Sequence, residues 1–196
     1  MKKDLLWELS NSKNGYLFTS DVVKAGISKT YLSTFVKENN YEKVAHGIYI
    51  APDVFPDELY ILQSTNPKAI FTGETALYLN NMIDTEYTMI EVYMPRGMSL
   101  SHLKNKGISV KTLSLELYEM GKTTVISLSG NTVTTYDRER CFCETIKNRK
   151  KMEVQLFQSA IKDYMTGKGK NLPALAEYAK KLNIRDEVMK YVEIFL

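Results

Sequence analysis

Two closely spaced prolines divide the sequence into a short amino-terminal part and a longer remainder. Pro52 and Pro56 lie in APDVFPDE, after the apolar, strand-like GIYI and before the helical ELYILQS. Each proline fixes its own φ angle and removes a backbone hydrogen-bond donor, which suits a linker or a sharp exit from a strand. We therefore predict a domain boundary here, with one domain over residues 1–55 and another over residues 56–196.

Composition predicts a soluble globular protein of the cytoplasm. The 196 residues are 44% hydrophobic and 25% charged, as in ordinary globular domains. No stretch approaches the ~18 consecutive apolar residues of a membrane-spanning helix, so we expect no membrane segment. Asp4 and Glu8 interrupt the apolar residues that follow the two N-terminal lysines, which argues against a signal peptide.

Charge is distributed unevenly along the chain. Residues 1–51 hold seven lysines against five acids, residues 52–99 two bases against seven acids, and residues 100–196 seventeen bases against eleven acids. The net charge of +3 therefore combines segments of opposite sign, which indicates charged faces on the folded protein. The small surplus in the first segment predicts weak, salt-sensitive binding of a single copy to a polyanion.

The amino-terminal part is predicted to form three helices and a hairpin. The first helix is expected over residues 2–11, the second from a cap at Thr19 or Ser20 to residue 25, the third from a cap at Ser28 to about residue 39, and the two strands of the hairpin in YEKVA and GIYI. In the second helix Val22 and Val23 are expected to face inward, and Gly26 to end it.

The third helix has two distinct faces. Tyr31, Leu32, Phe35 and Val36 form one continuous apolar stripe, which predicts a face packed on a core. The opposite face holds only hydroxyls and lysines, with no acid before Glu38, and its residues are Lys29, Thr30, Ser33, Thr34 and Lys37. Solvent-facing helices usually mix both signs of charge, whereas these groups can donate to phosphates and base edges.

The order of these elements is that of a winged helix-turn-helix. A short helix, a turn with Gly26 and a second helix are followed at once by a hairpin with Lys43 and His46 near its tip. We predict that double-stranded DNA is contacted by Ser28, Lys29, Thr30, Ser33, Thr34, Lys37, Lys43 and His46, with further phosphate contacts from Lys13 and Lys24. The alternative is a three-helix unit that binds protein and has no nucleic-acid role.

The remainder is predicted to be a mixed strand-and-helix domain with a helical tail. Helices are expected over residues 58–64 and 74–80, strands over 89–94, 108–113, 123–128 and 132–136, and the tail helices over 138–148, 153–165, 172–182 and 186–195. Strands followed by helices indicate the α+β class, so the whole chain is predicted to be α+β, with a winged helix-turn-helix in front.

Nothing in the sequence predicts an enzyme, a cofactor or a metal site. Asp84 and Glu91 have the order of a restriction-type nuclease core, but Tyr93 occupies the lysine position of that motif, and Glu91 is expected on the solvent side of its strand. Gly-x-Ser-x-Gly and P-loop motifs are absent. Cys141 and Cys143 are too close in sequence to face each other on a helix, so we expect reduced, partly buried thiols.

Three segments resemble AbiEi-type antitoxins of bacterial abortive-infection systems. Residues 14–52, NGYLFTSDVVKAGISKTYLSTFVKENNYEKVAHGIYIAP, are similar to the N-terminal winged helix-turn-helix of that family, through the turn AGIS and the closing HGIY. AIFTGETALYLNNM and IEVYMPRG are similar to the family's short strand with its Ala-Leu helix and to its strand ending in Pro-Arg-Gly. The resemblance is strong to about residue 97 and weak over the helical tail.

The resemblance implies two roles. Members are similar to autorepressors that bind inverted repeats in their own promoter, with two copies per operator. Their C-terminal domain counteracts a nucleotidyltransferase-like toxin without a stable complex, which is type IV toxin–antitoxin behaviour and serves phage defence. The alternative that remains open is a winged-helix regulator that binds another protein or senses an effector and has no toxin partner.

The run KNRKK contains four cations in five residues, Lys147, Arg149, Lys150 and Lys151. One interpretation is a helix C-terminus, favoured by the helix dipole, followed by a solvated turn. The other is a basic patch that binds nucleic acid, in particular the RNA substrate of the toxin, or an acidic partner.

Overall fold

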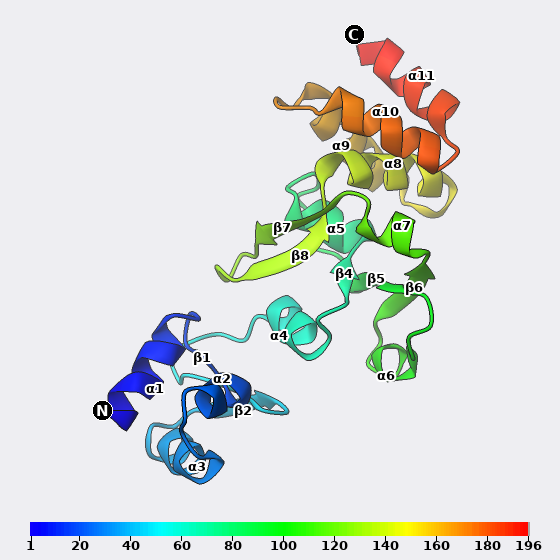
Figure 1. The fold of residues 1–196 in the computed structure, drawn as a ribbon. Helices are drawn as coiled ribbons and strands as arrows, with labels where there is room; N and C mark the ends of the chain where they lie inside the picture. The colour runs from blue at the N-terminus through cyan, green and yellow to red at the C-terminus, as the bar shows by residue number, and fades with distance from the viewer. Residues whose placement is uncertain (196) are drawn as a thin grey trace. The chain divides into compact units, whose positions relative to one another are not determined.

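A computed structural model describes residues 1–195 and divides the chain into two compact units. The first unit comprises residues 1–67 together with residues 126–133, and the second comprises residues 68–125 and the chain from residue 134 onwards. The predicted mixture of helices and strands with a helical tail is confirmed (Figure 1). Within residues 1–195, no helix combines the length and apolar character needed to cross a membrane.

The first unit contains four helices and a small sheet. Its elements are α1 (Lys2–Asn11), β1 (Tyr16–Phe18), α2 (Thr19–Lys24), α3 (Lys29–Glu38), β2 (Glu42–Ala45), β3 (Ile48–Ile50) and α4 (Glu58–Thr65). The sheet is antiparallel, in the order β1-β3-β2, with Tyr16 opposite Ile50 on one side of β3 and Lys43 opposite Tyr49 on the other. The central strand β3 therefore joins the hairpin to the start of the chain.

Helix α3 begins as the sequence predicts. The Ser28 hydroxyl caps it by accepting from the amide of Tyr31 at 3.2 Å. Leu32, Phe35 and Val36 are buried and pack with residues of α1 and α2 in the core of this unit. Phe35 and Val36 follow Leu32 by three and four residues, which is the spacing of side chains on one face of a helix.

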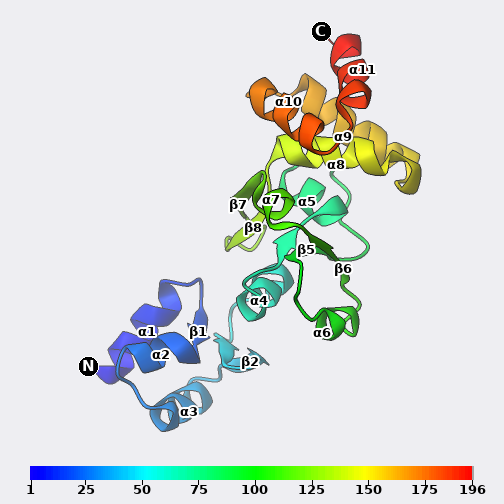
Figure 2. The same cartoon turned by 45° about the vertical axis from the view of Figure 1, so that its right-hand side comes forward.

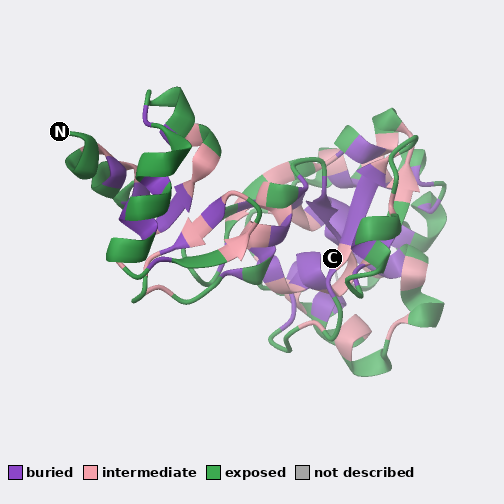
Figure 3. Cartoon of the chain, turned by 90° about the horizontal axis from the view of Figure 1, so that it is seen from below, coloured by how far each residue is buried: buried purple, intermediate pink, exposed green. Residues whose placement is uncertain are grey.

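Two apolar side chains predicted to be buried are exposed instead. Val23 is 47% exposed, because the six-residue helix α2 buries only Val22 on its inner side. Tyr31 is 38% exposed, because it lies at the border of the α3 stripe; its ring faces the ammonium of Lys2, 5.9 Å away. Figure 3 shows how buried residues gather in the interior of each unit while the outer helix faces are exposed.

The start of α2 also differs from the prediction. Neither Thr19 nor Ser20 caps this helix, because the helix already begins at Thr19 and Phe18 occupies the cap position without a side-chain hydrogen bond. The reason is strand β1, which was not predicted: it pairs with β3, and the chain passes directly from the strand into the helix. The Thr19 amide instead donates to the carbonyl of Gly47, in the turn between β2 and β3, at 2.8 Å.

Asp57 is the polar centre of the first unit. It is 5% exposed, and its carboxylate accepts from the Tyr60 amide (3.0 Å), the Ser127 hydroxyl (2.5 Å) and the Asn131 side-chain amide (2.9 Å). Its own amide donates to the Tyr16 hydroxyl at 2.7 Å. One buried carboxylate thus joins β1, the segment after the prolines, and residues 126–133, which come much later in the chain.

The second unit is a sheet with helices packed on it. Its elements are β4 (Ile70–Phe71), α5 (Gly73–Leu79), β5 (Glu91–Pro95), α6 (Ser101–Lys104), β6 (Ser109–Leu113), α7 (Leu115–Glu119), β7 (Lys122–Ile126), β8 (Thr132–Tyr136), α8 (Arg138–Asn148), the 3₁₀ turn η1 (Arg149–Lys151), α9 (Val154–Thr166), α10 (Leu172–Lys181) and α11 (Arg185–Phe195). The five strands have the order β6-β5-β4-β8-β7, and the tips of β7 and β8 belong to the first unit. Helices α8–α11 lie together on one side of this sheet (Figures 1 and 2).

The tail helices agree with the prediction, and the short helices α6 and α7 do not appear in it. They have four and five residues, too few for a hydrophobic period to show. Strand β4, of two residues, lies in AIFT, where the resemblance alone implies a short strand. Strand β5 runs over Glu91–Pro95, slightly later than predicted. Helix α8 is the inner helix of the tail: eight consecutive residues, Glu139–Ile146, are buried, including Arg140 at 0% exposure.

We expect Asp57→Ala to destabilise the first unit by about 1–3 kcal/mol, because two side-chain donors and the Tyr60 amide would lose their acceptor. Trp7 is the only tryptophan of the chain and packs edge-on against Phe35, so its fluorescence reports on this unit during urea unfolding. Asp53→Ala, at an exposed position nearby, is the control. Equal urea midpoints for the two variants would contradict the anchoring role of Asp57.

Candidate functional site

The polar face of α3 is open to solvent. All six predicted contact residues on it, Ser28, Lys29, Thr30, Ser33, Thr34 and Lys37, are exposed. Two of their hydroxyls are already engaged: Ser28 caps the helix, and the Thr34 hydroxyl donates to the carbonyl of Thr30 at 3.3 Å. Among the described residues, the side chains of the other four have no hydrogen-bond or ion-pair partner, so they are free to contact a ligand.

The hairpin residues lie beside the start of this face. Lys43, in β2, and His46, in the turn after it, are both exposed. They line an open hollow of about 600 Å³ together with Lys29 at the start of α3. Hydroxyls of Thr19 and Ser20 at the start of α2 belong to the same lining. The structure thus brings three of the predicted contact residues together, from three elements, around one surface suited to an anion.

The predicted flanking contacts differ from each other. The Lys13 ammonium forms an ion pair with Asp21 at 2.5 Å and lies 4.5 Å from the centre of the Phe18 ring. Its charge is therefore engaged within the protein. Lys24, at the end of α2, is exposed and has no partner in the described chain.

The basic run lies in the second unit, at the end of α8 and in η1. Lys147, Arg149, Lys150 and Lys151 are all exposed. Arg149 has a structural contact, since its guanidinium donates to the Tyr191 hydroxyl at 3.3 Å. No partner is found in residues 1–195 for Lys147, Lys150 and Lys151, so the three lysines of this run present free charge.

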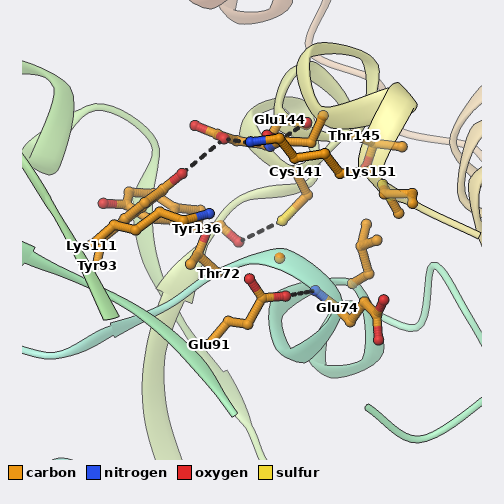
Figure 4. A pocket seen from close by; sticks show the side chains of 14 residues that line it. Thr72, Glu74, Glu91, Tyr93, Lys111, Tyr136, Cys141, Glu144, Thr145 and Lys151 are labelled. Atoms are coloured by element: carbon orange, nitrogen blue, oxygen red, sulfur yellow. Dashed lines mark hydrogen bonds between the residues drawn. The ribbon is translucent and has the colours of Figure 1, made fainter. Parts of the chain in front are cut away.

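A second candidate site is a cavity of about 120 Å³ inside the second unit. Strands β5 and β6, the start of α5, helix α8 and η1 all contribute to its wall, and its charged lining residues are Glu74, Glu91, Lys111, Glu144 and Lys151 (Figure 4). In that view the side chains of Lys111 and Glu91 point into the cavity from neighbouring strands. The parallel pairing of β5 and β6 sets Tyr93 opposite Lys111, which places them on the same face of the sheet.

Glu91 is not on the solvent side of its strand, contrary to the prediction. It shares a face of β5 with Tyr93, which is 8% exposed, and that face is covered by α8. The Glu91 carboxylate turns to the start of α5, where it accepts from the amide of Glu74 at 3.2 Å. Gly73, with φ of +55°, makes this approach possible, because a Cβ atom there would overlap the carboxylate.

The inner wall of the cavity rests on a buried ion pair. Arg140 donates through Nε and Nη2 to Oε1 of Glu144, at 3.1 and 2.8 Å. The Tyr93 hydroxyl donates to the other oxygen at 3.1 Å. Burial, followed by the charge of Glu144, raises the pKa of Tyr93, so this hydroxyl remains a donor. Burial likewise raises the pKa of Cys143 to about 12, which leaves its thiol unreactive at neutral pH.

Sequence reasoning did not predict this cavity as a site. The spacing of Glu91 and Tyr93 shows that they share one face of a strand, but no pattern reveals that Lys111 comes alongside or that Glu144 covers them. The cavity is formed by residues from six elements, α5, β5, β6, β8, α8 and η1, each of which looks ordinary alone. The polar face of α3, in contrast, belongs to one continuous segment.

Comparison with known proteins gives a fold relationship only. No protein-family model and no curated protein matches the sequence. The chain is similar to the crystal structure of the RV2827C protein from Mycobacterium tuberculosis, with a TM-score of 0.58. The two chains are 9% identical, over 94% of this chain and 75% of the other. At this identity the likeness concerns the fold.

We expect Glu74→Gln to change how stability depends on pH. Burial, and then the charge of Glu91, raises the pKa of the Glu74 carboxyl. Its contribution to stability is therefore complete below the pKa of an unfolded glutamate, about 4.3, and is lost as pH rises through the higher value of the folded protein. The neutral variant should match the wild type at about pH 3.5 and exceed its melting temperature at about pH 7.

Circular dichroism at both pH values measures this difference. Glu86→Gln, at an exposed loop position, is the control and should follow the wild type at both. A Glu74→Gln melting temperature that differs from the wild type by the same amount at both pH values would contradict the assigned effect of burial.

Proposed function

We propose that this protein is a DNA-binding regulator whose first unit is a winged helix-turn-helix. Helices α2 and α3, joined through the turn at Gly26, are the helix-turn-helix, and the β2–β3 hairpin is the wing. The observation that carries the proposal is the solvent-exposed, acid-free face of α3, which adjoins a hollow lined by Lys29, Lys43 and His46. A protein-interaction helix has no need to exclude carboxylates from its surface.

Each part of this surface suits one component of duplex DNA. In the proposed complex α3 enters the major groove, where the free hydroxyls of Thr30 and Ser33 contact base edges. Lys29 and Lys37 bind phosphates on either side of the groove, and Lys43 and His46 of the wing bind the adjacent backbone. The small positive surplus of this segment makes two copies on one inverted repeat the expected form of tight binding.

We further propose an antitoxin role for the residues after the predicted boundary, 56–196, most of which belong to the second unit. The support is the resemblance of residues 14–52, 69–82 and 90–97 to AbiEi-type antitoxins. On this proposal the protein represses its own operon in the cytoplasm. It also counteracts a nucleotidyltransferase-like toxin without catalysis and without a stable complex. The exposed lysines of the 147–151 run are the candidate antitoxin surface, through the toxin's RNA substrate.

A second candidate function is favoured by one observation. The polar cavity of the second unit is suited to a small molecule, which is what an effector-sensing regulator without a toxin partner would need. The two functions share the DNA-binding unit and differ in what the second unit recognises.

We expect single changes on α3 to weaken binding to a fragment of the protein's own promoter. Ser33→Ala should cost about 1–3 kcal/mol on the operator and little on scrambled DNA, because it removes a base contact. Lys29→Ala and Lys37→Ala should weaken both and lower the salt dependence of log K by about 1 each, because each removes a phosphate contact. Gel shifts at several salt concentrations measure these effects.

Lys106→Ala is the matched control, since it removes an exposed lysine from the second unit. The DNA-binding proposal fails if Lys29, Thr30, Ser33, Thr34 and Lys37 can each be changed to alanine with no loss of operator affinity. It also fails if no promoter fragment shows salt-dependent binding.

We expect antitoxin activity to separate from DNA binding. In cells that express the cognate toxin, the full-length protein with all five α3 residues changed to alanine should still rescue growth. The full-length Lys147→Ala/Lys150→Ala variant should lose rescue and keep operator affinity. This assignment would be overturned if the α3 variant lost growth rescue and the Lys147→Ala/Lys150→Ala variant kept it.

A further inference from the structure

The cavity of the second unit contains charges of both signs that do not pair with each other. Lys111 and Lys151 have no hydrogen-bond or ion-pair partner within the part of the chain that the structure describes. Glu91 accepts only the Glu74 amide, and no cation among residues 1–195 forms an ion pair with either carboxylate. Glu144, on the inner wall, is different, because Arg140 already balances it.

Lys111 and Lys151 are exposed to solvent, whereas Glu74 and Glu91 are half-buried, and a half-buried carboxylate without an ion-pair partner carries a desolvation cost. Glu74 shows this cost: burial and the charge of Glu91 raise the pKa of its carboxyl. Direct pairing of Lys111 with Glu91 would relieve the cost, yet no such pair is present between these described residues. The two carboxylates and the two lysines therefore line one cavity without pairing with each other, as a ligand that carries both a positive and a negative charge would require.

The charges and the volume restrict the class of ligand. The unpaired carboxylates of Glu74 and Glu91 disfavour a polyanion, and two lysines disfavour a simple cation. Among the described residues, no group of three or more His, Cys, Asp or Glu side chains could hold a metal ion. A cavity of about 120 Å³ is slightly smaller than the roughly 150 Å³ cavity that holds benzene, so it accepts only a few heavy atoms.

We propose that this cavity binds a small free α-amino acid. Its ammonium group would face Glu91 and Glu74, and its carboxylate would face Lys111 and Lys151 (Figure 4). The ammonium group of the ligand would then pair with the carboxylates, and its carboxylate with the lysines, where the protein itself supplies no ion-pair partner. The Arg140–Glu144–Tyr93 cluster holds the inner wall in place, so the site exists before the ligand arrives. This proposal names a ligand class for the effector-sensing candidate function and does not depend on DNA binding or on an antitoxin role.

The test uses the full-length protein with glycine, alanine and serine as probes. Thermal shift and isothermal titration calorimetry compare each free amino acid with its N-acetyl form, which lacks the ammonium charge, and its amide, which lacks the carboxylate. We expect at least one free amino acid to bind and raise the melting temperature. Both derivatives should bind at least about tenfold more weakly.

Two variants locate the site. Lys111→Met keeps an aliphatic chain of similar length and removes only an unpaired charge, so we expect it to fold and to lose at least about tenfold in affinity. Lys151→Met, at an exposed position on the same cavity, gives an independent measurement of the same loss. Lys106→Met is the control and should bind as the wild type does.

The proposal is overturned if none of the three amino acids binds, if the derivatives bind as well as the free forms, or if both Lys111→Met and Lys151→Met bind like the wild type. These outcomes are independent of the DNA-binding proposal, which is measured by operator affinity of α3 variants in the first unit. If the protein bound amino acids and not DNA, the amino-acid proposal would stand and the DNA-binding proposal would fail.

Discussion

The ion pair between Arg140 and Glu144 is the interaction on which the second unit depends. Arg140 is fully buried, and its guanidinium lies 5.1 Å from the centre of the Tyr136 ring. A buried charge costs several kcal/mol unless it is paired and hydrogen-bonded, and Glu144 supplies that pairing from one turn further along the same helix. The Tyr93 hydroxyl then connects the pair to the sheet. Helix α8 can therefore lie in the interior, where it contacts α5, α9, α10 and α11.

This arrangement also explains why the cavity is polar while the surrounding core is not. The inner face of α8 presents Glu144 toward β5 and β6, and the strands present Tyr93, Glu91 and Lys111 in return. The first unit has its own polar centre at Asp57, so each unit combines a hydrophobic core with buried carboxylates, Asp57 in the first unit and Glu139 and Glu144 in the second.

Local signals in the sequence predict local structure well, and contacts between distant segments poorly. Helix α3 was predictable because its cap and its buried stripe lie within about ten residues. Strand β1 was not, because three residues carry no visible alternation and its partner β3 lies about thirty residues later. Val23 and Tyr31 were wrongly assigned to the core. Helical spacing gives the direction in which a side chain points, but it does not show how far the packed neighbouring elements extend over that side of the helix. The hydrogen bonds from Ser127 and Asn131 to Asp57 span 70 and 74 residues, and no pattern in the sequence predicts them.

The discontinuity of the first unit has a consequence for how the chain folds during synthesis. Although this unit contains the N-terminus, its buried Asp57 finds two of its donors only in residues 126–133. A nascent chain that has emerged as far as residue 67 already contains α1 to α4, but it lacks the segment that satisfies this carboxylate. Domains usually fold in order as they leave the ribosome. Here the unit whose larger part is translated earlier is completed only after residues 68–125 of the second unit have been made. The last step in folding the first unit therefore waits for synthesis of part of the second.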